Sequence, residues 1–179
     1  LCTVFGVPAA YAMCRTKTGG KPLSIWILMQ RMLPPVTLAI PLFILVWRLG
    51  IQDTWLGLAL AHVSFNLPFA IWLMMGFFNE VPIELEESGI VDGCTRIQTL
   101  LRITLPLAAP GLAAMAIFIF VANWSSFLWP LIILDSPEKY TLPIAVAKLS
   151  GAFIDKTQYV AAGSVIAVFP VIVLFFFLQ

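Results

Sequence analysis

The amino-acid sequence predicts an all-α fold, a polytopic bundle of transmembrane helices. The chain is 61% hydrophobic and only 11% charged, whereas a soluble domain carries roughly 25% charged residues. Its apolar runs are continuous and recur at the length of about 20 residues that a helix needs to cross a bilayer. Strands of a membrane barrel would instead alternate apolar and polar residues over about ten positions. The pattern therefore favours helices in lipid.

Charge, cysteine and histidine content exclude several classes of function. The net charge of +1 gives no basic surface for a nucleic acid. Cys2, Cys14 and Cys94 are scattered and form no CxxC pair, so neither a disulfide framework nor a zinc site is expected. The single histidine, His62, lies in an apolar run without a matching nucleophile. We therefore expect no catalytic residues and no metal site, and an enzyme is not predicted.

The apolar segments are expected to form a single transmembrane domain. The predicted spans are residues 1–14, 23–47, 55–78, 107–134 and 160–179. Residues 79–105 form a polar loop between the third and fourth spans, and residues 135–159 form a loop with a short helix. Both ends of the chain fall inside apolar runs, so the natural protein is expected to continue beyond each of them.

The loop 79–105 is unusually acidic for so apolar a chain. More than half of the nine acidic residues lie within thirteen positions of it, namely Glu80, Glu84, Glu86, Glu87 and Asp92. Proline suits the first position of a helix, and negative charge near that end is favourable with the helix dipole. The pattern predicts a helix from Pro82 to Val91, ended by Asp92-Gly93 with Gly93 in a left-handed conformation.

A second helix is expected to begin near Thr95, which makes the loop a helix–turn–helix along the membrane surface. Its predicted apolar stripe is Ile97, Leu100, Leu101 and Leu105. Two interpretations of the loop remain open from the residues alone. It is either a solvated connection or a docking element for a cytoplasmic partner, since Ser88 and Gly89 are small and the glutamates have no basic residue at i+4.

The stretch EESGIVDGCTRIQTLLRITLPLAAP, residues 86–110, resembles the EAA loop of binding-protein-dependent ABC importer permeases. Glu87, Asp92, Gly93, Pro106 and Pro110 fall on positions of the family motif. Ser88 and Gly89 stand where the family has two alanines, and Cys94 and Leu100 replace its usual Ala and Phe. The segments RMLPPVTLAIPLF, FNLPFAIWLMMGFF and ANWSSFLWPLIIL resemble the carbohydrate branch, of the maltose-permease type. The resemblance covers nearly the whole chain.

The resemblance implies a permease subunit in the bacterial plasma membrane that takes up a sugar. The cytoplasmic loop 79–105 would then couple the bundle to a separate ATPase. The implied coupling residues are Glu84, Glu87, Ser88, Gly89, Asp92 and Gly93. A second permease subunit would complete the pathway and an extracytoplasmic solute-binding protein would deliver the sugar. This chain would bind no cofactor, because ATP and magnesium belong to the ATPase, and it contains no GxxxxGK[ST] pattern.

Two alternative functions are a permease for a non-sugar solute and a stand-alone secondary transporter. The second needs ionisable groups within the membrane, for which only Arg31 and His62 are candidates. We expect Arg31 to extend its guanidinium to the membrane surface. His62 and Asn66 are one helical turn apart, and we expect them to bond each other or a neighbouring helix.

Polar residues interrupt the fourth span before Pro130. Asn123, Trp124 and Ser126 are the candidates for a sugar path, because a sugar needs hydrogen-bond partners and an apolar face for its ring. Asn123 and Ser126 are three residues apart and are expected to share one helix face, which Pro130 continues one turn further on. The other interpretation is that these polar groups join neighbouring helices.

Overall fold

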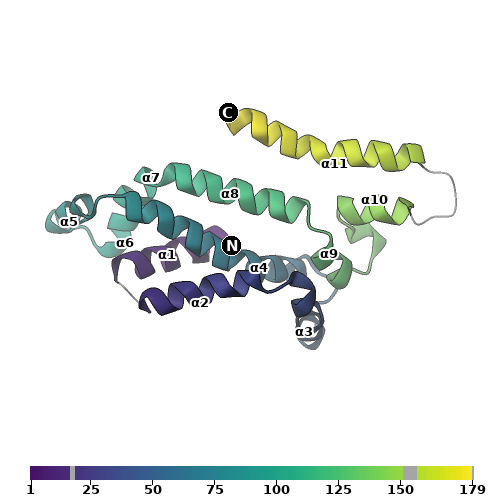
Figure 1. Ribbon diagram of the computed structural model, residues 1–179, viewed down its shortest axis with the longest axis horizontal. Helices are drawn as coiled ribbons and strands as arrows, with labels where there is room; N and C mark the ends of the chain where they lie inside the picture. Colours follow the sequence, from purple (N-terminus) through teal and green to yellow (C-terminus); the bar gives the residue numbers. More distant parts are fainter. Residues whose placement is uncertain (17–18, 151–156, 179) are drawn as a thin grey trace. The chain divides into compact units, whose positions relative to one another are not determined.

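The computed structural model describes residues 1–16, 19–150 and 157–178. Every regular element in these ranges is helical (Figure 1), which confirms the all-α prediction. Residues 151–156 of the predicted loop 135–159 and the last residue of the predicted span 160–179 lie outside the described residues.

The helices follow the apolar runs closely, with short connections between them. Their bounds are α1 (Cys2–Arg15), α2 (Gly20–Met32), α3 (Pro35–Arg48), α4 (Trp55–Glu80), α5 (Ile83–Val91), α6 (Arg96–Thr99), a π-helical segment (Leu100–Thr104), α7 (Leu105–Leu107), α8 (Ala109–Trp124), α9 (Leu128–Ile133), a 3₁₀ turn (Pro137–Lys139), α10 (Leu142–Ser150) and α11 (Thr157–Leu178). The chain divides into two compact units. Unit 1 is Leu1–Pro34 with Val63–Ile119, and unit 2 is Pro35–His62 with Phe120–Gln179.

Two helices among the described residues are long and apolar enough to cross a membrane alone: α4, and the part Thr157–Phe176 of α11. Two further pairs of helices meet the same criterion only when each bent pair is taken as one span. They are Pro22–Met32 with Pro35–Arg48, and Arg96–Leu107 with Ala109–Trp124, the latter bent by 80°. By length and composition, the described residues therefore offer two segments that could span a membrane, or up to four if each bent pair is one span.

Helix breaks lie within both of the predicted spans 23–47 and 107–134, the first of them at Leu33 and Pro34. Leu33 is extended, with φ −66° and ψ 129°, because the ring of Pro34 disfavours helical geometry in the residue before it. In the predicted span 107–134 the helix also breaks after Trp124, where α8 ends, apart from the 80° bend between Leu107 and Ala109. Pro130 has no N–H for the carbonyl four residues earlier and its ring clashes with that carbonyl. A continuous helix through Ser126 is therefore disfavoured.

Small residues bring the helices of unit 1 close together. A Cβ added at Gly6 would lie 3.2 Å from the Cβ of Ala70, and one at Gly111 would lie 2.2 Å from the Phe77 ring. These positions let α1 and α8 approach α4, as is common where helices pack in lipid. The buried cluster between them contains Tyr11, Met74, Phe78 and Met115.

In unit 2, the turn between α3 and α4 is tied to the chain that follows α9. The Oδ1 atom of Asp53 accepts hydrogen bonds from the backbone N–H groups of Asp135 at 3.0 Å and Ser136 at 3.1 Å. Its Oδ2 atom pairs with Lys139 Nζ at 2.7 Å. The bonds from Lys139 and then Ser136 hold the pKa of the Asp53 carboxyl well below its usual range. This connection lies outside the helices that could span the membrane.

Candidate functional site

The loop 79–105 is a helix–turn–helix whose turn has a defined cap. The N–H of Cys94 donates to the carbonyl of Gly89 at 2.9 Å, and that of Gly93 donates to Ile90 at 3.0 Å. This pair of bonds is a Schellman motif, which needs a residue with positive φ after the cap. Gly93 has φ +92°, so the predicted end of the first helix is confirmed.

The second arm starts with a capping box, in which Thr95 and Gln98 satisfy each other's backbone N–H groups. The helix then widens into the π segment, where the Thr104 hydroxyl donates to the Thr99 carbonyl five residues back at 3.4 Å. The wider turn shifts which residues face inward. Thr99, Leu100 and Thr104 are buried, whereas Ile97 is 71% and Leu101 57% exposed. Of the predicted apolar stripe, Leu100 therefore faces inward, whereas Ile97 and Leu101 lie on the outside of this arm.

The structure places most of the predicted coupling residues on the outside of α5 and its turn. Glu84, Glu87, Ser88, Asp92 and Gly93 are all exposed. Gly89 is different, because it is buried against the π segment. A Cβ added there would lie 2.3 Å from the Cδ1 atom of Ile103. Gly89 therefore allows the two arms to pack closely rather than forming part of the outer surface.

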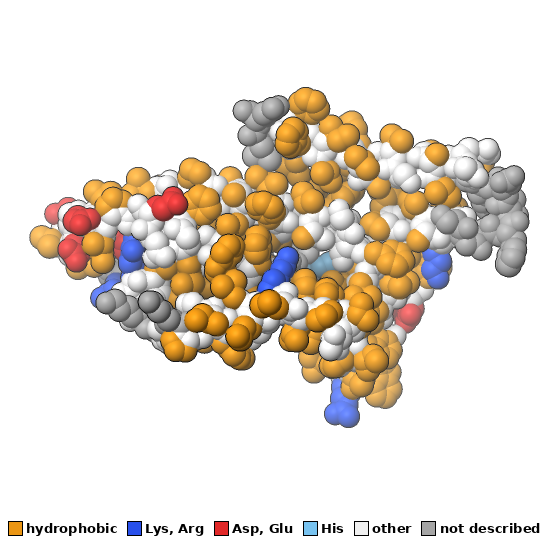
Figure 2. Space-filling view, viewed as in Figure 1, with side chains coloured by type: hydrophobic (Ala, Val, Ile, Leu, Met, Phe, Trp, Pro, Cys, Tyr) orange, Lys and Arg blue, Asp and Glu red, His pale blue; other side chains and the backbone are white. Residues whose placement is uncertain are grey.

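The outer surface of α5 is apolar as well as acidic. Four large apolar side chains are exposed on this short helix, namely Ile83, Leu85, Ile90 and Val91, the last at 86%. The acidic side chains gather over the same helix at one end of unit 1 (Figure 2). An exposed apolar patch bordered by charges is typical of a protein contact.

Glu86 lies on the inward face of α5, although its neighbours in the sequence are exposed. It is 3% exposed and pairs with Arg15, with 2.9 Å between Arg15 Nε and Glu86 Oε1. Tyr11 donates its hydroxyl to the other carboxylate oxygen at 2.9 Å. We call Tyr11, Arg15 and Glu86 the buried polar cluster. The sequence interpretation missed it, but the spacing of Glu86 from the small Gly89, one helical turn on, marks the same inward face.

The candidate sugar-path residues are brought together only in part. Trp124 and Ser125 line a pocket of about 410 Å³ in unit 2, opposite Pro143 and Val146 from α10 and Ser164 from α11. The Trp124 indole N–H donates to the carbonyl of Ala167 at 2.8 Å. Its ring stacks on Phe120 with 5.7 Å between centroids. Trp124 therefore holds the end of α8 against α11.

Asn123 and Ser126 do not line this pocket. Asn123 is half-buried and already has an interaction partner within the chain. Ser126 lies in the non-helical connection between α8 and α9, where its N–H donates to the Asn123 carbonyl at 3.2 Å. The continuous helix face predicted from Asn123 to Pro130 is therefore absent, because the helix ends at Trp124.

Arg31 does not extend to the membrane surface, so that prediction is wrong. Its Nη1 atom donates to the carbonyl of Phe65 at 3.2 Å and to Asn66 Oδ1 at 3.1 Å. The guanidinium lies over the rings of Phe65 and Phe69, with its carbon 4.8 and 5.0 Å from their centroids. Asn66 is thus bonded to a neighbouring helix, the second of the two outcomes expected for it.

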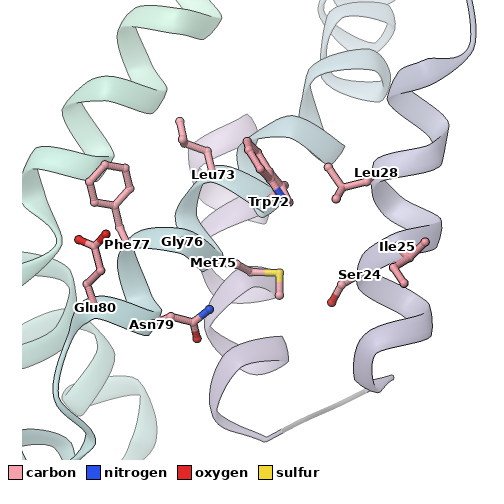
Figure 3. A pocket seen from close by; sticks show the side chains of 10 residues that line it. All are labelled: Ser24, Ile25, Leu28, Trp72, Leu73, Met75, Gly76, Phe77, Asn79 and Glu80. Carbon is pink, nitrogen blue, oxygen red and sulfur yellow. The ribbon is translucent and has the colours of Figure 1, made fainter.

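A second cavity of about 340 Å³ lies between α2 and α4 in unit 1. Figure 3 shows Trp72 and Met75 of α4 facing Ile25, Leu28 and Ser24 of α2. None of the predicted site residues lines it. No group of three His, Cys, Asp or Glu side chains that could hold a metal ion occurs within residues 1–16, 19–150 and 157–178.

Comparisons with known proteins agree with this geometry. The family model described as the inner membrane component of binding-protein-dependent transport systems matches residues 3–179. An ABC transporter permease protein of Streptomyces antibioticus is 38% identical over 177 residues, which are 98% of this chain and 77% of that protein. A trehalose transport system permease protein of Mycobacterium tuberculosis is 38% identical over 176 residues, 97% of this chain and 64% of that protein.

The fold also matches a solved structure. A bacterial ABC transporter involved in the import of the acidic polysaccharide alginate superposes with a TM-score of 0.78 at 23% identity, over 97% of this chain and 66% of that chain. The present chain thus spans about two thirds of the length of the solved chain and of the mycobacterial relative. The helical architecture agrees with the family match over residues 3–179, which shows that the chain belongs to the inner membrane components of binding-protein-dependent transport systems.

Proposed function

We propose that this chain is a membrane-spanning permease subunit of an ATP-driven importer that takes up a sugar. It pairs with a second permease subunit, receives substrate from an extracytoplasmic solute-binding protein, and is driven by a separate ATPase. ATP and magnesium are bound by the ATPase. The loop 79–105 faces the cytoplasm in this arrangement.

The outer face of α5 carries the proposal. This helix exposes Glu84, Glu87 and Asp92 beside large apolar side chains, and its inward face is fixed by Glu86 and Gly89. A rigid helix with one fixed face and one unsatisfied apolar and acidic face fits a groove with basic residues at its rim. Among the predicted coupling residues, we therefore assign the contact to Glu84, Glu87, Ser88 and Asp92, and assign Gly89 and Gly93 to holding the shape.

A sugar is supported by the pocket in unit 2 and by the substrate named for the mycobacterial relative. The pocket combines the indole of Trp124 with the hydroxyl-bearing residues Ser125 and Ser164, the two features that a sugar ring and its hydroxyls require. Ser125, Ser126 and Phe127 are non-helical. Backbone of that kind is tolerated at membrane depth where it is buried in protein or lines a wet cavity. We keep Asn123 and Ser126 as proposed residues of the sugar path, which would pass the non-helical connection between α8 and α9.

Two substitutions on α5 test the proposal, one that reverses a charge and one that places a charge in the apolar patch. In membranes containing the partner ATPase, Glu87→Lys and Val91→Asp are expected to weaken copurification of the ATPase at least about fivefold, because important contact residues near the centre of an interface contribute about 1 kcal/mol or more. Uptake of radiolabelled trehalose should fall in parallel. Glu138→Lys, the same change on an exposed acid of unit 2, is the matched control and should leave both unchanged.

Normal ATPase association by both α5 variants would remove this helix from the contact. If the native chain binds the ATPase and takes up another solute but none of the sugars tested, it is a permease of different specificity. Uptake without any ATPase would indicate a secondary transporter.

A further inference from the structure

The buried polar cluster joins three helical elements of unit 1 through one guanidinium. Arg15 is the last residue of α1, and its Nη2 atom lies 2.8 Å from Glu86 Oε1 on α5. The same Nη2 atom donates to the carbonyls of Phe78 at 2.8 Å and Val81 at 2.9 Å. Carbonyls in the last turn of a helix have no partner within that helix. Arg15 therefore caps α4 while it holds α5.

The cluster is almost completely withdrawn from solvent. The side chains of Arg15 and Glu86 are 9% and 4% exposed, and both carboxylate oxygens have hydrogen-bond donors. Desolvating two charges offsets most of their attraction, so a buried ion pair stabilises a fold little compared with an apolar pair of the same volume. Such a pair does fix the position of one helix relative to another. The planar guanidinium of Arg also fixes the angle between them, because its N–H groups point in set directions.

The buried polar cluster lies at the link between α4 and α5, so it fixes how these two helices are placed relative to each other. Only Val81 and Pro82 separate α4 from α5, and Arg15 bonds the carbonyl of the first of them. Without this bond the link would be a hinge at which α5 could tilt while α4 stayed in place. With it, α1, α4 and α5 are held as one body, and Gly89 packs α5 against Ile103 on its other side.

We propose that Arg15, Glu86 and Tyr11 are positioning residues that make α4 follow the movement of α5, so that ATPase motion is transmitted to the membrane helices. This inference rests on the proposed function. A purely structural cluster would affect how much protein folds and assembles, but it would not change how far the membrane helices respond once the complex has formed. The two roles are therefore separable by a measurement on assembled complexes.

Gly76 offers a reporter on α4 that needs no knowledge of the substrate. It lines the cavity between α2 and α4 (Figure 3), and a Cβ added there meets nothing within 4 Å. The complete importer, with Cys2, Cys14 and Cys94 replaced by alanine and Gly76 by cysteine, is reconstituted in proteoliposomes. The rate at which a charged maleimide reacts with the new thiol is measured without nucleotide and with ATP and vanadate, alongside ATP hydrolysis.

We expect ATP and vanadate to change the labelling rate at least about fivefold in the otherwise native background, the lower end of a typical coupling between sites. In Arg15→Lys, which keeps the charge but loses the fork, hydrolysis per complex should persist while the change in labelling shrinks below about twofold. Arg48→Lys is the matched control, because Arg48 is the last residue of α3 and is exposed. It should respond like the native background.

Tyr11→Phe provides a milder variant if Arg15→Lys does not assemble, since it removes one donor to Glu86 and leaves the ion pair. It should reduce the labelling response in part. A full response in assembled Arg15→Lys or Tyr11→Phe complexes would show that the cluster is only structural. An absent response in the native background, with hydrolysis intact, would also overturn the inference, because α4 would not be following α5. Failure of any ATPase to copurify with the native chain would instead refute the proposed function.

Discussion

At Gly93 the backbone conformation alone restricts which side chain fits. Its φ of +92° lies in a region that side chains with a Cβ rarely adopt, yet nothing lies within 4 Å of where that Cβ would be. The restriction is therefore conformational and not steric. Gly89, four residues earlier, is the reverse case, because its helical backbone accepts any residue but Ile103 occupies the space.

Gly93→Val is expected to destabilise the turn by about 1–2 kcal/mol, since a β-branched residue is forced into a left-handed conformation. The bundle should still insert, and ATPase copurification and uptake should fall. Gly93→Asn is the control, because Asn tolerates positive φ far better. Equal behaviour of the two variants in both assays would mean that the turn conformation does not matter to docking.

The low pKa of Asp53 makes a prediction about acid stability. Its folded-state pKa lies below that of the unfolded chain, so the ionised carboxylate contributes stability above a pH of about 3.9. That contribution is lost as the pH falls through the folded-state pKa. The difference in Tm between the native protein and Asp53→Asn should be equal at pH 7 and pH 5 and smaller at pH 3. A difference in Tm that grows in acid would contradict the assignment.

At the scale of elements, local signals and distant contacts contributed differently to what the sequence could predict. The end of the first helix at Asp92-Gly93 and the start of the second at Thr95 depend on neighbouring residues only, and both appear in the structure. The π segment includes the hydrogen bond from the Thr104 hydroxyl to the Thr99 carbonyl. The spacing of apolar residues in the sequence does not predict such a bond. The burial of Glu86 depends on Arg15, 71 residues away. Local patterns therefore give helix ends, whereas inward faces need knowledge of which helices meet.

The contact between α4 and α8 depends on the absence of a side chain at Gly111. A Cβ there would lie 2.2 to 2.8 Å from three atoms of Phe77, so Gly111→Ala should separate the helices and cost about 1–3 kcal/mol. Thermal unfolding of the purified complex measures this. Gly76→Ala, where the space is open, should be neutral or slightly stabilising. Combining Gly111→Ala with Phe77→Leu should restore part of the loss; no restoration would place the strain elsewhere.

At the scale of the whole molecule, the proposed orientation puts the loop 79–105 and its half-buried Cys94 in the cytoplasm. A membrane-impermeant maleimide should therefore leave Cys94 unlabelled in intact cells. It should label Cys94 in inverted vesicles stripped of the ATPase. Cys94→Ser measures the background from Cys2 and Cys14. Strong labelling from outside intact cells would reverse the orientation of every span.

The ion pair between Arg15 and Glu86 also has a consequence for biosynthesis. The partners are separated by 71 residues, and at a synthesis rate of roughly 5–20 residues per second the carboxylate is made about 4–14 s after the guanidinium. The helices α2, α3 and α4 are synthesised during that interval, before Glu86 is available to Arg15. Transfer of a charged guanidinium into the hydrocarbon of the membrane is unfavourable. We therefore expect Arg15 to keep the end of α1 near the membrane surface until the loop that contains Glu86 has been synthesised.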